Sequence, residues 1–325
     1  MKQALVYCLV LNHNGVDVLE ECLTSLSRQN YQPYKIMVID NNSNDGSILT
    51  IKEQFPNVEL LQLNKNCGFG RAYNRALQAI EAKKTEYIAF LNSDVVLEPQ
   101  WLPSTVRCFT DHSCDCVQTI ITDYHDYKKI DSFGIFVTRH LIFGDKGHGK
   151  VASLPFTVDS PPFGPSFAAV LLRKNVVETL QETGDFFDQQ LNTFLEDVDI
   201  SFRLHYHGFS TYVHPQPLCH HWRSFTADKY PFTKYFMIGR NYFLVLFKHL
   251  DNSIIRDHWL RIFTHRLTFL KGTMKHPVYF LGFLSGSLWG LMRALLMKNS
   301  DTIVSSTKRE RKEKLIRDIL AGDYE

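Results

Sequence analysis

The sequence predicts an α/β protein in which a largely parallel sheet is flanked by helices and followed by a mostly helical carboxyl-terminal region. Apolar runs alternate with helical patterns over about the first 95 residues, and polar side chains follow directly after those runs. Long aromatic-rich helical patterns begin after about residue 225. The chain has 325 residues, 44% hydrophobic and 22% charged, which excludes disorder, collagen and a disulfide scaffold as whole-chain descriptions.

Four short apolar runs predict the first four strands, and helical periodicity separates them. Gly15 opens the first helical pattern, the polar loop 41–47 caps a helix that begins near Ser47, and Gly68–Ala82 forms another helix. The first run lacks a signal-peptide cleavage pattern and is predicted to be a buried strand. The four runs are Leu5–Leu11, Lys35–Ile39, Val58–Leu63 and Tyr87–Leu91.

Polar side chains follow three of these runs. Right-handed crossovers place the strand ends on one edge, which is where open α/β sheets bind ligands. Asn12, Asp40 and Asp94 each come just after an apolar run. We therefore expect these three residues to converge on one cleft.

The pattern is weaker from Val95 to about Lys150 and becomes clear again later. Phe167–Leu172 is an apolar run after a Pro/Gly stretch, Glu196–Tyr206 is a predicted helix, and Ser210–Val213 is a predicted strand leading to His214, His220 and His221. The last helices are expected at Tyr230–Leu250, Ile254–Lys275 and Val278–Lys298. The predicted domains are residues 1–225, in halves 1–95 and 96–225, and the helical region 226–325.

Charge is distributed unevenly along the chain. Residues 1–222 contain 18 basic and 25 acidic side chains, whereas residues 223–325 contain 18 basic and 9 acidic ones. This asymmetry indicates two roles, because acidic sites suit metals and sugars while basic surfaces suit phosphate-bearing partners, anionic lipid or nucleic acid.

The carboxyl-terminal region contains 17 residues, His276–Met292, without Asp, Glu, Lys or Arg. A membrane span needs about 20 apolar residues. We therefore expect a helix lying in the membrane surface, flanked by Arg293 and Lys298, with the basic tail Lys308–Arg317 attracted to anionic headgroups. The alternative is a helical bundle packed on the sheet with a solvated charged tail.

Three groups of residues are candidates for chemistry. Asp40 can accept the imide N–H of uracil or thymine, although an aspartate there also commonly forms a turn. Asp94, in Asn92-Ser93-Asp94, can hold a hard divalent cation that bridges two phosphates, and His220 is a plausible second ligand. The alternatives are a turn or helix cap for Asp94 and a structural histidine.

The third group is Glu196-Asp197-Val198-Asp199, in which neighbouring carboxylates raise the proton affinity of one another. One of them can then act as a general base. Asp197 and Asp199 point in different directions on a helix, so a shared metal site is not expected. The alternative is a first helical turn that favours acidic residues.

Two further patterns are weaker. Gly68-Phe69-Gly70-Arg71-Ala72-Tyr73 matches half of a dinucleotide fingerprint and can also place a phosphate at a helix start beside Arg71. The seven cysteines are odd in number and include no Cys-x-x-Cys pair. Neither a zinc ribbon nor a disulfide framework is therefore expected, and a reducing compartment is favoured.

Several ordered motifs together resemble the family-two glycosyltransferases, in particular their rhamnosyltransferase-like branch, over roughly residues 4–245. His220 followed by Ser224, and then Arg240-Asn241, also resembles that branch. The motifs are Leu11-Asn12-His13-Asn14-Gly15, Val38–Ser47, Asn66–Asn74, Phe90–Asp94 and Glu196–Arg203.

The resemblance implies a GT-A fold, a nucleotide diphosphate sugar as donor, and inversion at the anomeric carbon. It implies Asp197 as the catalytic base and Mg²⁺ or Mn²⁺ held by Asp94 and His220; Asn92 leaves the family's Asp-x-Asp motif with one carboxylate. The expected substrate-binding residues are Asn12, Asn14, Asp40, Asn42, Gly68, Arg71, Asn74, Asn92, Gly164 and Glu196.

The leading hypothesis is a cytoplasmic glycosyltransferase, peripheral on the inner face of the cell membrane. It would transfer rhamnose from dTDP-rhamnose, or a sugar from a UDP-sugar, to a lipid-linked or cell-surface saccharide, with no nucleic-acid partner. One alternative is an inactive nucleotide-sugar-binding or scaffold protein of the same fold, which the single carboxylate at Asp94 favours. Another is an NAD enzyme, which rests on the half-matched glycine motif.

Overall fold

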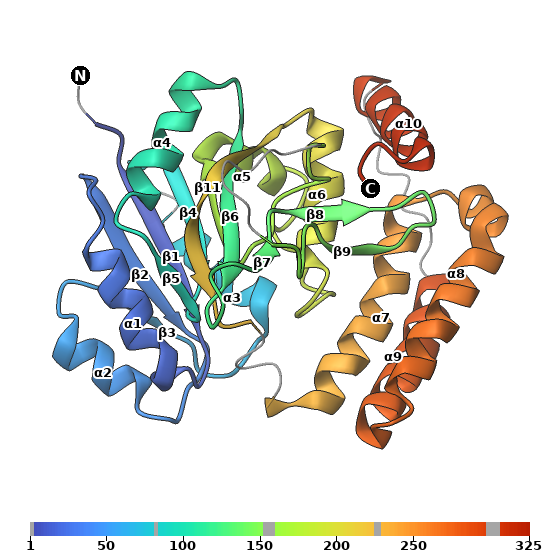
Figure 1. Ribbon diagram of the computed structural model, residues 1–325, viewed down its shortest axis with the longest axis horizontal. Helices are drawn as coiled ribbons and strands as arrows, with labels where there is room; N and C mark the ends of the chain where they lie inside the picture. Colours follow the sequence, from blue (N-terminus) through green and yellow to red (C-terminus); the bar gives the residue numbers. More distant parts are fainter. Residues whose placement is uncertain (1–2, 81–83, 152–159, 224–228, 297–305) are drawn as a thin grey trace.

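The computed structural model describes residues 3–80, 84–151, 160–223, 229–296 and 306–325. A twisted central sheet has helices on both faces, and a layer of long helices stands beside its carboxyl edge (Figure 1). The strands are β1 Val6–Asn12, β2 Tyr34–Asp40, β3 Glu59–Gln62, β4 Tyr87–Asn92, β5 Val95–Leu97, β6 Cys116–Asp123, β7 Ile130–Ser132, β8 Ile135–Val137, β9 Phe143–Asp145, β10 Ala169–Arg173 and β11 Thr211–His221. The helices are α1 Val16–Ser27, α2 Ser47–Gln54, α3 Phe69–Ile80, α4 Trp101–Asp111, α5 Lys174–Gln181, α6 Glu196–His207, α7 Pro231–His249, α8 Asn252–Thr273, α9 Pro277–Leu296 and α10 Ser306–Ala321.

The strand pairing confirms the predicted parallel arrangement of the first four strands, whereas β10, β5 and β7 pair antiparallel with their neighbours. Within the described residues the order is β3-β2-β1-β4-β10-β6-β11-β5, and β7 pairs with β6. The first four strands are parallel, and Asn12 pairs with Asp40 while Leu11 pairs with Asn92. The polar residues after β1, β2 and β4 therefore lie on one edge, as expected.

Apolar cores on both faces of the sheet hold it between helices. One core joins the sheet to α1, α2 and α4, and the other joins it to α3, α5 and α6. The amphipathic spacing of Val18, Leu19, Cys22, Leu23 and Leu26 turns one face of α1 into the first core. All seven cysteines are free thiols, as expected.

Strand β11 is longer than the sequence predicts. The predicted strand ended at Val213, but pairing with β6 continues to His221 through register shifts around Pro217. Proline normally ends a strand, and here irregularities in the pairing accommodate it. His220 and His221 therefore lie inside a strand, on opposite faces.

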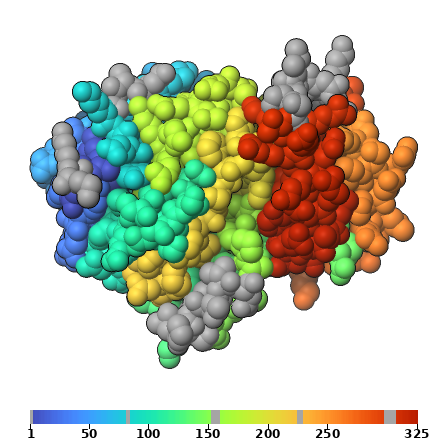
Figure 2. Space-filling model, turned by 90° about the horizontal axis from the view of Figure 1, so that it is seen from above, coloured from blue at the N-terminus to red at the C-terminus, as the bar shows by residue number. Residues whose placement is uncertain are grey.

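Helices α7 and α10 share an apolar core with α6 and β8, so the helical region packs on the sheet region. Helix α10 inserts Leu315, Ile316 and Ile319 into that core, and Arg311 donates to the carbonyl of His207. Figure 2 shows α10, in red, between the yellow and green part of the chain and the orange helices. The basic tail is thus docked along one side instead of extending freely. The proposed boundary at residue 225, together with Ser224 and Lys298, lies outside the described residues.

Candidate active site

A cavity of about 660 Å³ opens at the carboxyl edge of the sheet. Its walls come from the ends of β1, β4 and β11, the segment before β10, the loop before α6 and the first turns of α7. Asp94, Glu196 and Asp197 all line it. Chain segments about 100 residues apart in sequence thus place three acids around one space.

Asp94 faces His221 and not His220. The turn between β4 and β5 carries Asp94, and β5 pairs with the end of β11, so that His221 Nε2 lies 3.2 Å from Asp94 Oδ1. His220 points to the other face of the strand, with Nδ1 2.7 Å from Thr122 Oγ1 and Nε2 3.0 Å from Glu98 Oε1. The expected placement of His220 beside Asp94 is therefore wrong, because alternate residues of a strand point in opposite directions.

A chain of alternating charges continues from His221 along the cavity wall. His221 Nδ1 lies 2.8 Å from Asp131 Oδ2, Arg223 donates to Asp131, and the same guanidinium lies 2.6 Å from Asp145 Oδ2. Burial alone lowers the pKa of His221, but the carboxylates of Asp94 and Asp131 outweigh it and raise that pKa to about 10. The imidazole is therefore protonated at neutral pH, and it must lose that proton before Nε2 can bind a metal ion.

Asp197 has the electrostatics of a general base. Burial, followed by the negative charge of Asp145, raises its pKa from 3.8 to about 7, although Arg223 and the backbone N–H of Val198 oppose the rise. Burial, followed by the charge of Asp197, also raises the pKa of Glu196 well above its usual value. A carboxylate with a pKa near 7 is well matched to taking a proton from a hydroxyl at neutral pH.

The loop before α6 is strained and tightly held. Asn192, Phe194 and Leu195 have positive φ angles of 66°, 71° and 63°, which are unfavourable for residues other than glycine. Asn241 on α7 donates through Nδ2 to the carbonyls of Leu191, Thr193 and Phe194 at 2.8, 2.8 and 2.7 Å.

Arg240 adds bonds of 2.7 and 2.6 Å to the carbonyls of Gln190 and Leu191. The Arg240-Asn241 pair that resembles the rhamnosyltransferase branch thus supports the loop that leads to Asp197.

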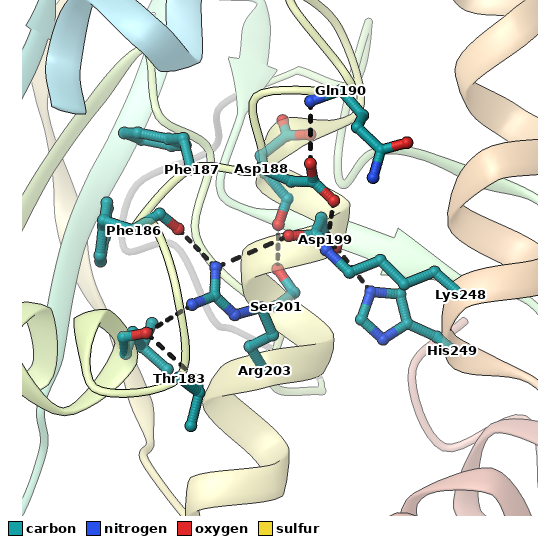
Figure 3. A network of polar contacts seen from close by, with 12 residues as sticks. Thr183, Phe186, Phe187, Asp188, Gln190, Asp199, Ser201, Arg203, Lys248 and His249 are labelled. Carbon is teal, nitrogen blue, oxygen red and sulfur yellow. Dashed lines mark hydrogen bonds and ion pairs between the residues drawn. The ribbon is translucent and has the colours of Figure 1, made fainter. Parts of the chain in front are cut away.

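Asp199 lies on the opposite side of α6 from the cavity. Its Oδ1 lies 2.6 Å from Lys248 Nζ and 2.7 Å from His249 Nε2, and Arg203 lies 3.8 Å from its other oxygen (Figure 3). Burial would raise the pKa of Asp199, but Lys248, His249 and Arg203 hold it far below its usual range. The expectation that Asp197 and Asp199 diverge is confirmed, and Asp199 ties α6 to α7.

Asp40 is buried beneath the cavity instead of lining it. Asn12 donates to Asp40 Oδ1 at 3.2 Å and the Ser43 backbone N–H donates to Oδ2 at 3.0 Å. Asp40 is only 1% exposed, so it occupies the turn-forming role of the alternative interpretation. Asn41, the next residue, lines the cavity and contacts Asn66 and Gly68.

The other predicted binding residues fall into two groups. Gly68 and Asn92 line the cavity; Gly68 has a φ of 84°, and an added Cβ would lie 1.6 Å from Asn192 Oδ1. The others do not line it. Asn12 is fully buried, Asn14 accepts from Asn44, Asn42 has a φ of 65°, Arg71 is exposed, Asn74 clamps the backbone of Phe187, and Gly164 packs against Ser201.

The structure adds cavity residues that sequence reasoning missed. His221 belonged to the histidine group, but the parity of an irregular strand could not be predicted. Asp131 and Asp145 lie in or next to strands of three residues, too short for a periodic signal. Arg223 and His13 also line the cavity, and His13 stood within a quoted motif without an assigned role.

The donor set fits a divalent cation that is shared with a substrate. Within the described residues no group of three His, Cys, Asp or Glu side chains is arranged to hold a metal. Asp94 and His221 Nε2, which lie 3.2 Å apart, offer two donors once the imidazole has lost its proton. Mg²⁺ is commonly held by one or two protein donors plus substrate phosphates and water.

The sheet and the acids at its carboxyl edge define a GT-A glycosyltransferase architecture. The crystal structure of S. aureus TarS 1-349 is similar with a TM-score of 0.57, covering 97% of this chain and 90% of that one at 16% identity. A Pyrobaculum calidifontis mannosyltransferase in complex with GDP-Man and Mn²⁺ gives 0.56, covering 99% and 86% at 14% identity. Residues 7–161 match the family model "Glycosyl transferase family 2".

Among curated proteins, the chain is similar to N-acetylglucosaminyl-diphospho-decaprenol L-rhamnosyltransferase of Mycobacterium tuberculosis. The two are 25% identical over 228 residues, which cover 62% of this chain and 71% of the relative. The resemblance predicted from the motifs is therefore confirmed at the level of the family.

Proposed function

We propose that this protein is an inverting glycosyltransferase that moves a sugar from a nucleotide diphosphate donor to a hydroxyl of a lipid-linked or cell-surface saccharide. One observation carries the proposal: Asp197, with its raised pKa, shares a cavity with Asp94 and the charge chain that begins at His221. This pairs a base with a site for an anionic leaving group. The donor is dTDP-rhamnose or a UDP-sugar.

The relatives support this choice of substrates. The Mycobacterium tuberculosis relative is by name a rhamnosyltransferase of a diphospho-decaprenol saccharide, and TarS has been crystallised with UDP and with UDP-GlcNAc. We propose that the acceptor is likewise a lipid-linked saccharide and that the protein works at the cytoplasmic face of a membrane.

Asp197 takes the proton of the acceptor hydroxyl while the oxygen of that hydroxyl attacks the anomeric carbon of the donor sugar. The nucleoside diphosphate leaves from the opposite face of the sugar. Asp94 and a deprotonated His221 would hold a divalent cation, which would supply positive charge for the leaving diphosphate. Asp145 keeps the proton affinity of Asp197 high, and the strained loop before α6 fixes the direction of its carboxylate. Preorganised charge of this kind lowers a barrier without reorganisation during the reaction.

The test compares Asp197→Asn with Asp111→Asn, a surface control on α4. We expect Asp197→Asn to lose transfer by at least about 10²-fold, typical of removing a general base, while it still binds the donor in calorimetry. The control should keep parental activity. Full turnover by Asp197→Asn would contradict the assignment of the base.

An inactive nucleotide-sugar-binding protein is the second candidate, and Asn92 in place of a first carboxylate favours it. A thermal-shift screen of nucleotide sugars, with and without Mn²⁺, identifies the donor. Donor binding without transfer or hydrolysis over a broad acceptor panel would establish this candidate and refute the first.

A further inference from the structure

Helices α8 and α9 carry a large exposed apolar surface. Seven of the exposed side chains of α9 are apolar, and their spacing sets them apart from the glycines that pack on α7, although Trp289 also contacts Phe236 and Arg240 of α7. We call these residues, with those of α8, the apolar face. They are Val278, Leu281, Leu288, Trp289, Met292, Leu295 and Leu296 on α9, and Trp259, Leu260, Phe263, Leu267 and Phe269 on α8.

Helix α9 differs from the apolar core helix of a globular protein, which is mostly buried. Only 28% of the most apolar stretch of α9 is buried, although α9 is long and apolar enough to cross a membrane. Contiguous exposed apolar surface of this kind marks a partner or a membrane.

The charge around the apolar face indicates which partner covers it. Residues 252–296 contain six lysines and arginines against one aspartate. Lys271 and Lys275 stand near the turn between the two helices, next to the apolar positions. Apolar side chains bordered by cations and almost free of acids match the surface of an anionic bilayer.

Helix α9 is packed tightly along α7. Its glycine stripe packs against the backbone of α7: added Cβ atoms at Gly282, Gly286 and Gly290 would lie 2.6, 2.0 and 2.4 Å from carbonyl oxygens of α7. Such close packing makes α7 and α9 one unit. In this fold the apolar face is therefore presented to the outside while α9 stays packed on α7.

Helix α7 is also a wall of the candidate active site. Tyr230, Thr233, Lys234 and Met237 line the cavity at helical spacing, and Gly282–Gly290 of α9 packs against the carbonyls of Phe232, Phe236 and Arg240 of the same helix. Figure 1 shows α7 between the sheet and α9. The wall between the cavity and α9 is therefore one helix thick, which is about 10 Å.

We propose that the apolar face of α8 and α9 docks on an anionic phospholipid bilayer and holds the cavity mouth at the membrane surface. A lipid-linked acceptor then keeps its chain in the bilayer while its saccharide reaches Asp197. The acceptor statement rests on the proposed function, whereas docking itself does not.

The test is co-sedimentation of the full chain with phosphatidylcholine vesicles, with or without phosphatidylglycerol, in the absence of donor. We expect binding that requires phosphatidylglycerol and weakens with salt. The double variant Leu281→Asp/Leu288→Asp, at positions 56% and 62% exposed, should lose more than tenfold in partitioning. Leu49→Asp on α2, 59% exposed and far from α9, is the matched control and should bind like the parent.

Two charge variants separate this face from the basic tail. Lys271→Gln/Lys275→Gln should weaken binding by about 30-fold, which is the combined contribution of two lysines near an anionic surface. Arg309→Gln/Lys314→Gln on α10 should leave it nearly unchanged. The proposal is overturned if the parent does not sediment, if Leu281→Asp/Leu288→Asp binds like the parent, or if light scattering shows that this variant only breaks a dimer.

Transfer to a soluble acceptor reports separately on the proposed function. An enzyme active in solution that ignores vesicles refutes docking alone. A protein that binds vesicles but transfers no sugar refutes the enzymatic proposal alone.

Discussion

Replacing Asp145 with Asn should move the acid limb of the activity profile to lower pH. Asp145 is the largest charge that raises the pKa of Asp197. The folded pKa of about 7 exceeds the ordinary 3.8 by an amount worth roughly 4 kcal/mol. Burial supplies more of this than Asp145, so removing one nearby charge should lower the pKa by about one.

The assay is kcat/KM against pH, which reports groups of the free enzyme. If the parental pKa is about 7, roughly a tenth of Asp197 is ionised at pH 6, and a fall of one raises this to about half. For each enzyme, kcat/KM at pH 6 is divided by the plateau value of the same enzyme. This ratio should be about five times larger for Asp145→Asn than for the parent.

Arg223→Gln provides the opposite sign, because this guanidinium lowers the pKa of Asp197. Its acid limb should move to higher pH. Glu196 on the same helix is unchanged in both variants. The electrostatic account of the base would be refuted if the acid limbs of both variants shifted in the same direction along the pH axis. It would also be refuted if the acid limb of Asp145→Asn shifted to higher pH.

The same pKa shift makes a prediction about stability. The folded state binds more protons on Asp197 than the unfolded state between about pH 3.8 and 7, so this group lowers the free energy of unfolding as pH rises through that window. The stability of Asp197→Asn relative to the parent should therefore be higher at pH 8 than at pH 5, by about 2.6 kcal/mol. Equal differences at both values in urea titrations would contradict the raised pKa.

Two packing predictions concern the supports of the site. Asn241→Leu leaves the carbonyls of Thr193 and Phe194 without their side-chain donor, while Leu191 keeps the bond from Arg240. The free energy of unfolding should fall by about 1–3 kcal/mol, and kcat should fall with it. Parental values of both, measured by urea titration and turnover, would contradict the supporting role. Gly286→Ala places a Cβ 2.0 Å from the Phe236 carbonyl and should cost about 1–3 kcal/mol; the matched Gly272→Ala, which meets nothing within 4 Å, should gain about 0.4–1 kcal/mol, and equal melting shifts for the pair would show that α7 and α9 are not closely packed.

The first part of the fold could be predicted because it depends on local signals. The apolar runs before Asn12, Asp40 and Asn92 are flanked by polar loops and helical spacing, and parallel topology then brings their ends to one edge. Asp94 and Asp197 meet in the cavity for the same reason. Each lies at the carboxyl end of a strand or at the start of a helix on that edge.

The rest depends on parity and burial, which sequence patterns do not encode. The choice between His220 and His221 is decided by register shifts around Pro217, because one residue of slip reverses every side chain in a strand. Asp40 lies at the sequence position expected of a ligand-binding residue, but its two carboxylate oxygens accept hydrogen bonds from Asn12 and Ser43. A polar residue after a strand can bind a ligand or stabilise the following loop, and only the three-dimensional structure distinguishes these two roles.

The uneven charge of the sequence acquires a physical meaning once the chain is folded. Acids of the first part, among them Asp94, Asp131, Asp145 and Asp197, gather at the cavity, while the surplus cations after residue 223 lie largely on α8, α9 and α10. The cavity also contains the cations His221, Arg223 and Lys234, and the divalent cation that we propose at Asp94 and His221 would add positive charge for a diphosphate. The cations of α8, α9 and α10 lie outside the cavity, where we propose that those of α8 and α9 meet an anionic bilayer. Because α7 stands between the cavity and α9, the two proposed sites, one for a nucleotide sugar and one for lipid, lie on different sides of that helix.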